Sequence, residues 1–375
     1  MKKTLAAVAV LGAFAGSAIA ADVTLYGIVD TGVGYAHTDY DGLKKDNVDS
    51  FQMKSGQASG SRWGLKGTED LGNGMTVGFI LEDGFTADDG AEADQMFDRE
   101  SSLFIEGGFG KLAFGRIGAI NNGTSSWAQM GVLSAFGTSS WGGYSAQISN
   151  LMSTAGKWDN MVAYQTPSFA GFKVYAQYSM GKTTSKGKAV EGAVENESSA
   201  DRYYAIGATY ANGPLAAYLA VDSTNYKSTG TAYGVDDSLT VTLGGNYNFE
   251  VAKVYFGAQY FDEVTLSSVG GIAGAEFGAT KVKGYGITLS ADAPVAGGKV
   301  MAGLGYVDAE SADSEKNEDF DLKRYAFSVG YDYPFSKRTD VYAVASYMQD
   351  DTDANATSSY DLSSYTVYVG LRHKF

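Results

Sequence analysis

A short basic segment alternates with apolar residues so that two positive charges fall on one face. Arg62 and Lys66 share their parity with Gly64, whereas Trp63 and Leu65 have the other parity. Successive side chains of a β-strand point to opposite faces, so this pattern predicts a strand with one cationic and one apolar face. Fixed charges of this kind can attract or repel small ions in a water-filled space without making or breaking bonds.

An acidic residue is predicted to accompany these basic residues. Glu82 has the opposite parity to Val77, Phe79 and Leu81 in the next alternating segment. It would therefore face the same space as the basic residues and brace them. The alternative for each charge is a position at the rim of the sheet, paired with a lipid headgroup or a neighbour.

The chain has few of the residue types that enzymes commonly use for catalysis. There is no cysteine, so thiol chemistry, disulfides and thiolate metal sites are excluded. The only two histidines are His37 and His373, which leaves little for His-based catalysis or a His-rich metal site. We therefore expect no enzyme activity, no cofactor and no bound metal.

The overall composition favours a β-protein. The 375 residues include 49 Gly, 26 Tyr and 19 Phe but only 4 Pro, and aromatic side chains suit a pleated surface. The formal charge of −15 argues against nucleic acid as a partner, because binding to phosphates needs a basic face. The simplest alternative source of this acidity is a set of solvated loops.

The first twenty residues are predicted to be a cleaved secretory signal. Lys2 and Lys3 precede the apolar run Leu5–Ala15, and Ala18-Ile19-Ala20 forms a small-residue cleavage motif. Removing residues 1–20 takes away two lysines and changes the formal charge from −15 to −17. Beyond residue 20 no stretch reaches the eighteen or so consecutive apolar residues of a membrane helix.

Residues 21–375 are predicted to form one β-barrel domain. Alternating segments are joined in turn by short turns and long polar loops, and a barrel can cross a membrane with strands that are only half apolar. Sixteen strands are expected, an even number that would close on itself and enclose an aqueous channel. A soluble β-sandwich is the alternative on pattern alone. The expected antiparallel strands are 22–37, 50–69, 75–85, 97–106, 111–118, 158–166, 171–180, 202–211, 215–225, 238–249, 253–262, 282–291, 299–308, 320–333, 339–349 and 364–375.

One connection in this scheme differs from the others. Segment 118–156 contains no Asp, Glu, Lys or Arg, although 19% of the chain is charged. Loops of this length are usually functional or disordered, and the aromatic residues Trp127, Phe136, Trp141 and Tyr144 argue against disorder. We expect this loop to fold inward and narrow a water-filled lumen.

Several blocks of sequence resemble the general diffusion porins of the Gram-negative outer membrane, especially the proteobacterial and neisserial type. Each block is weak alone, but together they follow the family's order across the whole mature chain. The blocks are Val23–Asp30, Ser61–Gly67 with Glu69–Gly74, Phe114-Gly115-Arg116, Tyr164 with Pro167–Phe172, Ser336–Asp340 and Gly370–Phe375.

This resemblance implies a transmembrane barrel of sixteen strands whose third extracellular loop folds into the pore. It also implies a homotrimer in contact with outer-membrane lipid and lipopolysaccharide, and passive diffusion of ions and small hydrophilic solutes. Phe375 would be the terminal aromatic residue recognised by the outer-membrane assembly machinery.

The resemblance also implies a pore constriction in which wall arginines face the inserted loop. These arginines carry over to Arg62, Arg99 and Arg116, and Trp127 would lie in the loop opposite them. The chain departs from the family where relatives often carry an arginine: it has Ala163, with Gln165 on the same face.

The loop also departs from the family, because it lacks the carboxylates that relatives place there. The field across the pore should therefore be weaker, so we expect a weak anion preference at the constriction, opposed by acidic residues of the outer vestibule. These residues are Asp88, Asp89, Asp94, Glu310, Asp313, Glu315, Glu318 and Asp319.

Two further functions remain as alternatives. A substrate-specific channel for sugars or small organic acids would use Trp127, Trp141 and Tyr144 as an aromatic slide. An outer-membrane barrel enzyme would need a nucleophile and a positioned base, for which the two histidines offer little.

Two short motifs are expected to have no ligand chemistry of their own. The acidic run Asp350-Asp351-Asp353 lacks the spaced glycine and bidentate glutamate of a calcium loop. It is interpreted as a solvated loop or a cation-bridged contact with lipopolysaccharide. Gly270-Gly271 is followed by no Gly-Lys-Ser/Thr sequence, and no helix is expected there, so it is not interpreted as a phosphate loop.

Overall fold

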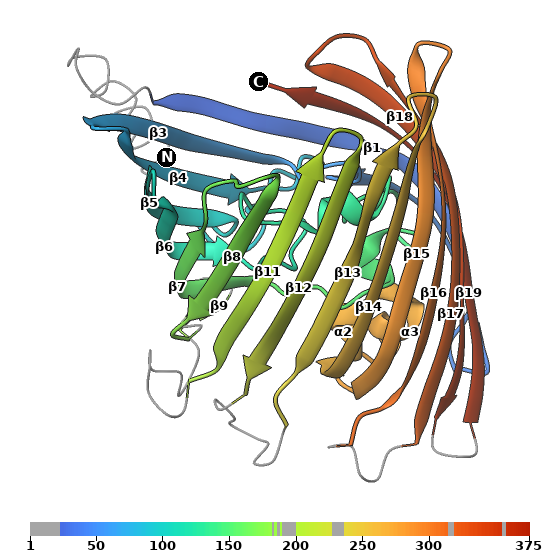
Figure 1. Ribbon diagram of the computed structural model, residues 1–375. Coiled ribbons are helices and arrows are strands. Elements are labelled where there is room, and N and C mark those ends of the chain that lie inside the picture. The colour runs from blue at the N-terminus through green and yellow to red at the C-terminus, as the bar shows by residue number, and fades with distance from the viewer. Residues whose placement is uncertain are drawn as a thin grey trace.

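The chain forms a closed antiparallel β-barrel, shown in Figure 1. The structure, a computed structural model, describes residues 23–181, 184–185, 188–189, 200–226, 236–313, 319–354 and 358–375. The predicted leader, residues 1–20, lies outside them. The strands of the wall are β1 (Thr24–Asp41), β2 (Val48–Ser55), β3 (Arg62–Gly72), β4 (Met75–Gly84), β5 (Glu100–Gly107), β6 (Gly110–Gly118), β7 (Lys157–Gln165), β8 (Phe172–Ser179), β11 (Arg202–Asn212), β12 (Leu215–Asn225), β13 (Leu239–Asn248), β14 (Lys253–Thr265), β15 (Lys281–Val295), β16 (Gly298–Ser311), β17 (Phe320–Pro334), β18 (Thr339–Ala354) and β19 (Ser358–Lys374).

These 17 strands form one sheet, in which β2 and β3 are two parts of one barrel strand. β2 pairs with Thr31–Thr38 of β1, and β3 pairs with Thr24–Ile28 of the same strand. The wall therefore has sixteen barrel strands, which confirms the predicted fold. A separate two-stranded pair, β9 (Thr184–Ser185) and β10 (Lys188–Ala189), lies in the connection between β8 and β11.

The predicted strand 50–69 is wrong at its centre, because residues 56–61 leave the ladder. Gly56 adopts a positive φ of 69°, which favours glycine. The backbone N–H groups of Ala58 and Ser59 donate to one carboxylate oxygen of Asp30, at 2.9 and 2.6 Å. This buried carboxylate replaces the strand partners that the detached backbone has lost.

The barrel closes between its first and last strands. β1 pairs with β19 from Ile28 opposite Lys374 to Asp41 opposite Asp361. Beyond this ladder, Gly27 N donates to Phe375 O at 3.1 Å and Phe375 N donates to Gly27 O at 3.0 Å. A sheet inside hydrocarbon cannot leave an edge unpaired, so this seam is a condition of the fold.

The two faces of the wall differ as expected for a membrane barrel. Along β17, Arg324, Ala326 and Ser328 are buried inside, whereas Tyr325 and Phe327 are exposed on the outside. This alternation gives an apolar outer face and a polar inner face. Among the described residues, no helix has the length and apolar character needed to cross a membrane.

The strands on the C-terminal side extend further than predicted. β18 runs to Ala354 rather than Gln349, and β19 starts at Ser358 rather than Ser364, with Ala354 opposite Ser358 in their register. The acidic run that starts at Asp350 therefore lies in a strand. Asp350 itself is fully buried, so the predicted solvated loop is wrong there.

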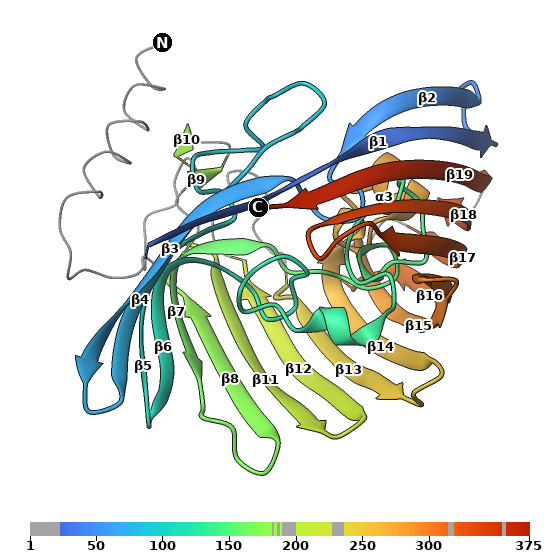
Figure 2. The ribbon, with the colours of Figure 1, turned by 90° about the horizontal axis from the view of Figure 1, so that it is seen from above.

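The long connections lie at one end of the barrel and the short turns at the other (Figure 1). Segment 119–156 is the third connection at the first of these ends, after 42–47 and 85–99, and contains the 3₁₀ turns η2 (Met130–Leu133) and η3 (Ile148–Asn150). Figure 2 looks along the barrel and shows this segment crossing the enclosed space. Segment 266–280 contains two short helices, α2 (Leu266–Val269) and α3 (Gly271–Glu276), so the expectation of no helix at Gly270-Gly271 is wrong.

Deleting Phe375 should destabilise the barrel, because it removes both backbone hydrogen bonds beyond the β1–β19 ladder. Each is worth about 1 kcal/mol net. We expect the refolded protein in detergent to lose its compact form, seen as fast migration of unheated samples on a gel, at a lower temperature. Phe375→Ala keeps the backbone bonds and should lose less. Equal losses in the two variants would show that the ring, which lies over Gly27, matters rather than the backbone.

Candidate functional site

Three charged side chains meet on the inner wall, two from the neighbouring strands β3 and β4 and one, Arg99, from the residue just before β5. Glu82 of β4 accepts a hydrogen bond from Arg99 Nε at 2.6 Å, and its other oxygen lies 3.5 Å from Arg62 Nε of β3. Tyr26 OH donates to the same Glu82 oxygen that faces Arg62, at 2.9 Å. The exposed fractions of the side chains are 24% for Arg62, 13% for Glu82 and 9% for Arg99, so Arg62 is the cation most open to solvent.

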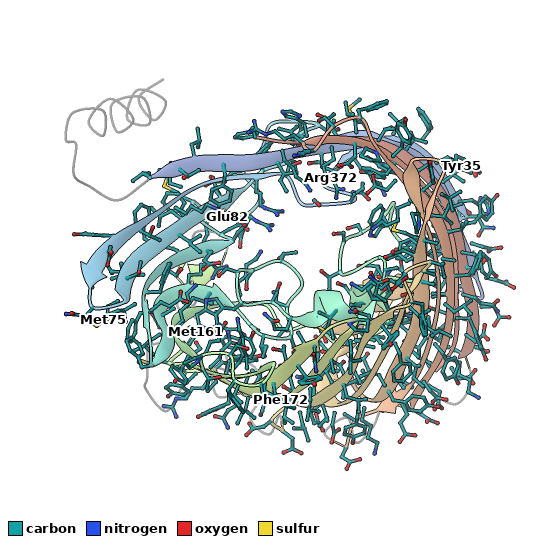
Figure 3. The ribbon with its side chains drawn as sticks, turned by 45° about the horizontal axis from the view of Figure 1, so that its top comes forward. Tyr35, Met75, Glu82, Met161, Phe172 and Arg372 are labelled. Atoms are coloured by element: carbon teal, nitrogen blue, oxygen red, sulfur yellow. The ribbon has the colours of Figure 1, made fainter. Side chains whose placement is uncertain are left out.

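Strand register explains why these side chains meet. Gly64 of β3 lies opposite Glu82, which in turn lies opposite Glu100 of β5. Glu82 of β4 therefore lies between Arg62 of β3 on one side and Arg99, next to β5, on the other. We call Arg62, Glu82 and Arg99 the charged cluster. Figure 3 shows Glu82 on the inner side of the wall.

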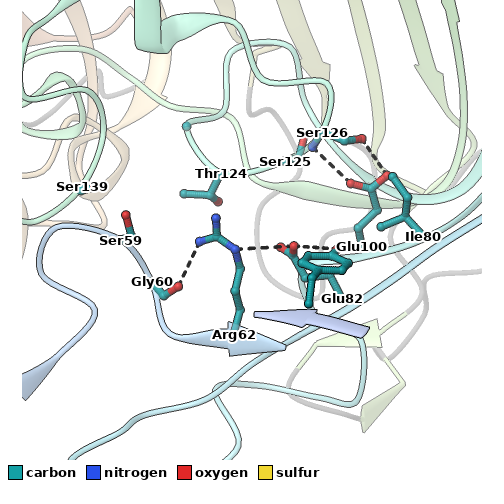
Figure 4. Close-up of a pocket in the computed structure, with 12 residues that line it drawn as sticks. Ser59, Gly60, Arg62, Ile80, Glu82, Glu100, Thr124, Ser125, Ser126 and Ser139 are labelled. Carbon is teal, nitrogen blue, oxygen red and sulfur yellow. Dashed lines mark hydrogen bonds and ion pairs between the residues drawn. The ribbon is translucent and has the colours of Figure 1, made fainter. Parts of the chain in front are cut away.

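The charged cluster faces the first part of segment 119–156. Arg99 Nη2 donates to the Thr124 carbonyl at 3.1 Å. The buried Glu100 accepts hydrogen bonds from Ser126 N and Ser126 Oγ, at 3.2 and 2.8 Å. A pocket of about 310 Å³ lies between them (Figure 4), lined by Tyr26, Ser59, Gly60, Arg62, Ile80, Glu82, Glu100, Gly123, Thr124, Ser125, Ser126 and Ser139. The surface that the segment gives to this pocket consists of uncharged residues.

Two other predicted residues lie close to this region in different environments. Lys66 has the parity of Arg62 and is exposed, with its Nζ 5.0 Å from the centre of the Tyr26 ring. Trp127 is 2% exposed, and its ring centre lies 5.3 Å from Lys111 Nζ. Trp127 is therefore a packing residue that anchors the segment, and its ring is covered.

Arg116 and Gln165 do not share the partners of the charged cluster. Arg116 pairs with Asp159 of β7, and its Nε donates to the Asp98 carbonyl at 2.8 Å. The register shifts around Arg116, between Gly115 and Ile117, so simple alternation does not place its side chain. Gln165 ends β7 opposite Lys111, beside a short turn.

A further set of inner-wall charges escaped the sequence analysis. Arg372 Nε donates to Asp340 at 3.0 Å, and Arg372 Nη1 donates to Ser59 Oγ at 2.9 Å. Tyr342 OH donates to Asp30 at 2.6 Å. Figure 3 shows Arg372 on the inner side of the wall. The sequence does contain a signal for this position, because Arg372 follows the outward-facing Leu371 in an alternating strand and therefore faces inward.

Acidic residues surround the end of the barrel that carries the long connections. Asp88, Asp89 and Asp94 are exposed in the connection between β4 and β5, and a hydrogen bond from the Thr86 hydroxyl lowers the pKa of the Asp89 carboxyl. Asp313 pairs with Lys283 at 2.7 Å. The predicted vestibule residues Glu315 and Glu318 lie outside the described residues. Within the part of the chain that the structure describes, no group of three or more His, Asp and Glu residues could hold a metal ion.

A family model, several relatives and a solved structure that resemble this chain are all described as porins. Residues 6–355 match the family model described as Gram-negative porin. An outer membrane porin protein of Bordetella pertussis is 37% identical, and outer membrane porin protein 32 of Delftia acidovorans is 31% identical, each over 100% of both chains. The solved anion-selective porin from Comamonas acidovorans has a TM-score of 0.69 and 28% identity, covering 95% of this chain and 100% of that one. OmpT of Vibrio cholerae shares the fold, with a TM-score of 0.61 at 17% identity.

Replacing Glu82 with Gln should destabilise the barrel, because two arginines lose their common carboxylate. Breaking a fully buried pair costs about 3–5 kcal/mol, and we expect about 2 kcal/mol for this partly solvated cluster. Urea unfolding in lipid vesicles, followed by tryptophan fluorescence, would measure the loss.

The matched control is Glu69→Gln, an exposed position on β3, where a change of less than about 0.5 kcal/mol is expected. The double variant Glu82→Gln/Arg99→Gln should recover part of the loss, because the two residues are coupled. Equal stabilities for Glu82→Gln and Glu69→Gln would contradict the stabilising role of the cluster.

Proposed function

The chain belongs to the Gram-negative porin family, and from that premise we propose that segment 119–156 and the charged cluster together form the narrow part of its channel. As a member of that family, the protein is an outer-membrane porin whose closed barrel encloses a channel for ions and small hydrophilic solutes.

One observation carries the proposal: the charged cluster faces a segment without charged side chains. Two guanidinium groups share one carboxylate in the cluster. Glu100, the other carboxylate that lines the pocket, is buried and bonded to Ser102 and Ser126, so Arg62 is the charge most open to the pocket. On the opposite side of the pocket, the Thr124 carbonyl accepts from Arg99, and Ser126 donates to Glu100 through its N–H and hydroxyl groups, so this side adds no charge of its own. An ion passing between the two surfaces would meet a small positive field, which favours anions weakly.

The acidic residues near the long connections oppose this preference at the mouth. The Comamonas porin, which is 28% identical in sequence, is described as anion-selective, and this supports the sign that we propose. Lys66 adds a further exposed positive charge on the parity of Arg62.

We also propose that the protein assembles as a homotrimer in contact with outer-membrane lipid and lipopolysaccharide. Phe51 and Met53 of β2 are more exposed than most of the apolar outer face, which suits a contact with another subunit. Phe375, whose ring remains partly exposed at the seam, is proposed as the signal read by the assembly machinery.

A substrate-specific channel is the less favoured function. Two of the three rings of the expected aromatic slide are covered, since Trp127 is 2% and Trp141 5% exposed. Trp141 packs edge-on against Phe136 and Tyr342, with ring centres 5.8 and 5.4 Å away. Such rings hold the segment in place and offer little surface to a passing solute.

Arg62→Gln should shift the channel toward cations, because it removes the most exposed charge of the cluster. We expect the anion-to-cation permeability ratio to fall by about two- to fivefold, as expected for a unit charge worth up to about 1 kcal/mol a few ångströms away in water. Reversal potentials across a planar bilayer in a dilute KCl gradient would measure the ratio, since dilute salt limits screening.

Arg338→Gln is the matched control, because it makes the same change in an exposed turn at the end with the short connections. It should leave the ratio almost unchanged. A ratio that Arg62→Gln does not alter would remove the charged cluster from the ion path and refute the proposed constriction.

A further inference from the structure

A second long connection packs against segment 119–156 in the interior. Segment 266–280 contacts it at Ser268, whose carbonyl accepts from Thr154 N at 3.2 Å and whose hydroxyl lies 2.9 Å from Ser153 Oγ. Leu266, Val269 and Ile272 are fully buried in the same apolar cluster as Leu151. The two segments are therefore packed together and joined by hydrogen bonds.

One arginine joins both segments to the wall. Arg324 of β17 lies opposite Asp350 of β18 in the strand register, and neither side chain is exposed. Arg324 Nε and Nη2 donate to the two carboxylate oxygens of Asp350, at 2.6 and 2.9 Å. The remaining donors reach the carbonyls of Asn150 at 2.8 Å, Val269 at 3.0 Å and Gly270 at 2.9 Å.

An arginine has five N–H donors, and the five hydrogen bonds described above give each of them an acceptor. One acceptor belongs to segment 119–156, two belong to segment 266–280, and two belong to the wall. Asp350 also accepts Ala273 N of α3 at 2.7 Å, which ties segment 266–280 to the second member of the ion pair. A buried ion pair is favourable only when its groups are all hydrogen-bonded, and this pair meets that condition by holding both segments.

The double glycine of segment 266–280 allows this close approach. Gly271 has a positive φ of 72°, and a Cβ there would lie 2.0 Å from Arg324 Cζ. Gly270 has a φ of 68°, and its Cβ would lie 2.3 Å from the Ser149 carbonyl oxygen. Both positions therefore need glycine, which gives Gly270-Gly271 a role that its sequence alone did not reveal.

We propose that segment 266–280 is a second wall of the constriction and that Arg324 is the positioning residue that fixes it to segment 119–156. This inference rests on the proposed function of segment 119–156. Arg324 does not contact the permeating ion. It sets the width of the passage by keeping the two segments in one position relative to each other.

The test uses a variant that removes the buried charges together, Arg324→Met/Asp350→Leu. Replacing a buried ion pair with apolar residues of similar size often leaves stability unchanged or improves it, so the barrel is expected to fold. With both segments released, we expect noisier open-channel current and faster permeation of neutral polyethylene glycols that the unmodified channel excludes. Lys283→Met, which breaks the exposed pair with Asp313, is the control and should change neither quantity.

A disulfide rescue separates positioning from a general structural role. The chain has no cysteine, so Ser153→Cys/Ser268→Cys introduces the only two thiols, at positions whose hydroxyl oxygens are 2.9 Å apart. In the Arg324→Met/Asp350→Leu background, oxidation should restore the low noise and the exclusion of polyethylene glycols. Reduction should abolish both again while the gel mobility of the folded barrel stays the same.

The inference is overturned if Arg324→Met/Asp350→Leu retains the current noise and solute exclusion of the unmodified channel, or if the disulfide fails to restore them. Arg62→Gln provides the separate test of the proposed function through the reversal potential. A shifted reversal potential in Arg62→Gln together with an unchanged Arg324→Met/Asp350→Leu channel would refute the positioning role and leave the constriction in place.

Discussion

Every strand of the wall belongs to one closed hydrogen-bond ladder, and this closure determines what each side of the wall can carry. In hydrocarbon every backbone N–H and C=O must find a partner within the protein, and the pairing of β1 with β19 provides this at the seam. Once the ladder is closed, alternation along each strand sends one set of side chains to lipid and the other to the interior. Closure therefore places a polar face inside the barrel. The side chains of this face hold segments 119–156 and 266–280 in position.

Those inner polar groups explain how a segment without charged residues can be held across a wide barrel. Backbone N–H groups of segment 119–156 donate to wall side chains at several points: Ala135 N to Ser290 Oγ, Ala146 N to Ser328 Oγ and Ser153 N to Gln259 Oε1, at 2.9, 2.8 and 2.6 Å. Each bond satisfies a donor that has no strand partner. The wall thus acts as an extended set of hydrogen-bond acceptors, and no charge is needed within the segment.

Features that depend on the two-residue alternation of a strand could be predicted from the sequence. Features that depend on a partner far away in the chain could not. The number of barrel strands and the inward position of Glu82 could be predicted, because alternation of apolar and polar residues can be seen within each short stretch of sequence. The break at residues 56–61 depends on the Asp30 carboxylate from another strand, and the strand position of Asp350 depends on Arg324. In both cases the conformation of a polar stretch depends on a partner many residues away, so the stretch alone resembles an ordinary strand or a loop. The partners of Arg116, Asp98 and Asp159, could not be predicted for a local reason, because the register shift beside Arg116 breaks the alternation.

The same need for partners limits how strongly this channel can select ions. An arginine that is almost buried is costly unless a carboxylate or carbonyl accepts its donors, and Arg99 uses Glu82 and the Thr124 carbonyl in this way. Each carboxylate that stabilises an arginine also cancels its field. Sharing Glu82 between Arg62 and Arg99 is a compromise, because one acid stabilises two cations and leaves Arg62 as the cation most open to solvent. A weak preference is therefore the expected result of a charged wall that must also be stable when the facing segment offers only neutral groups.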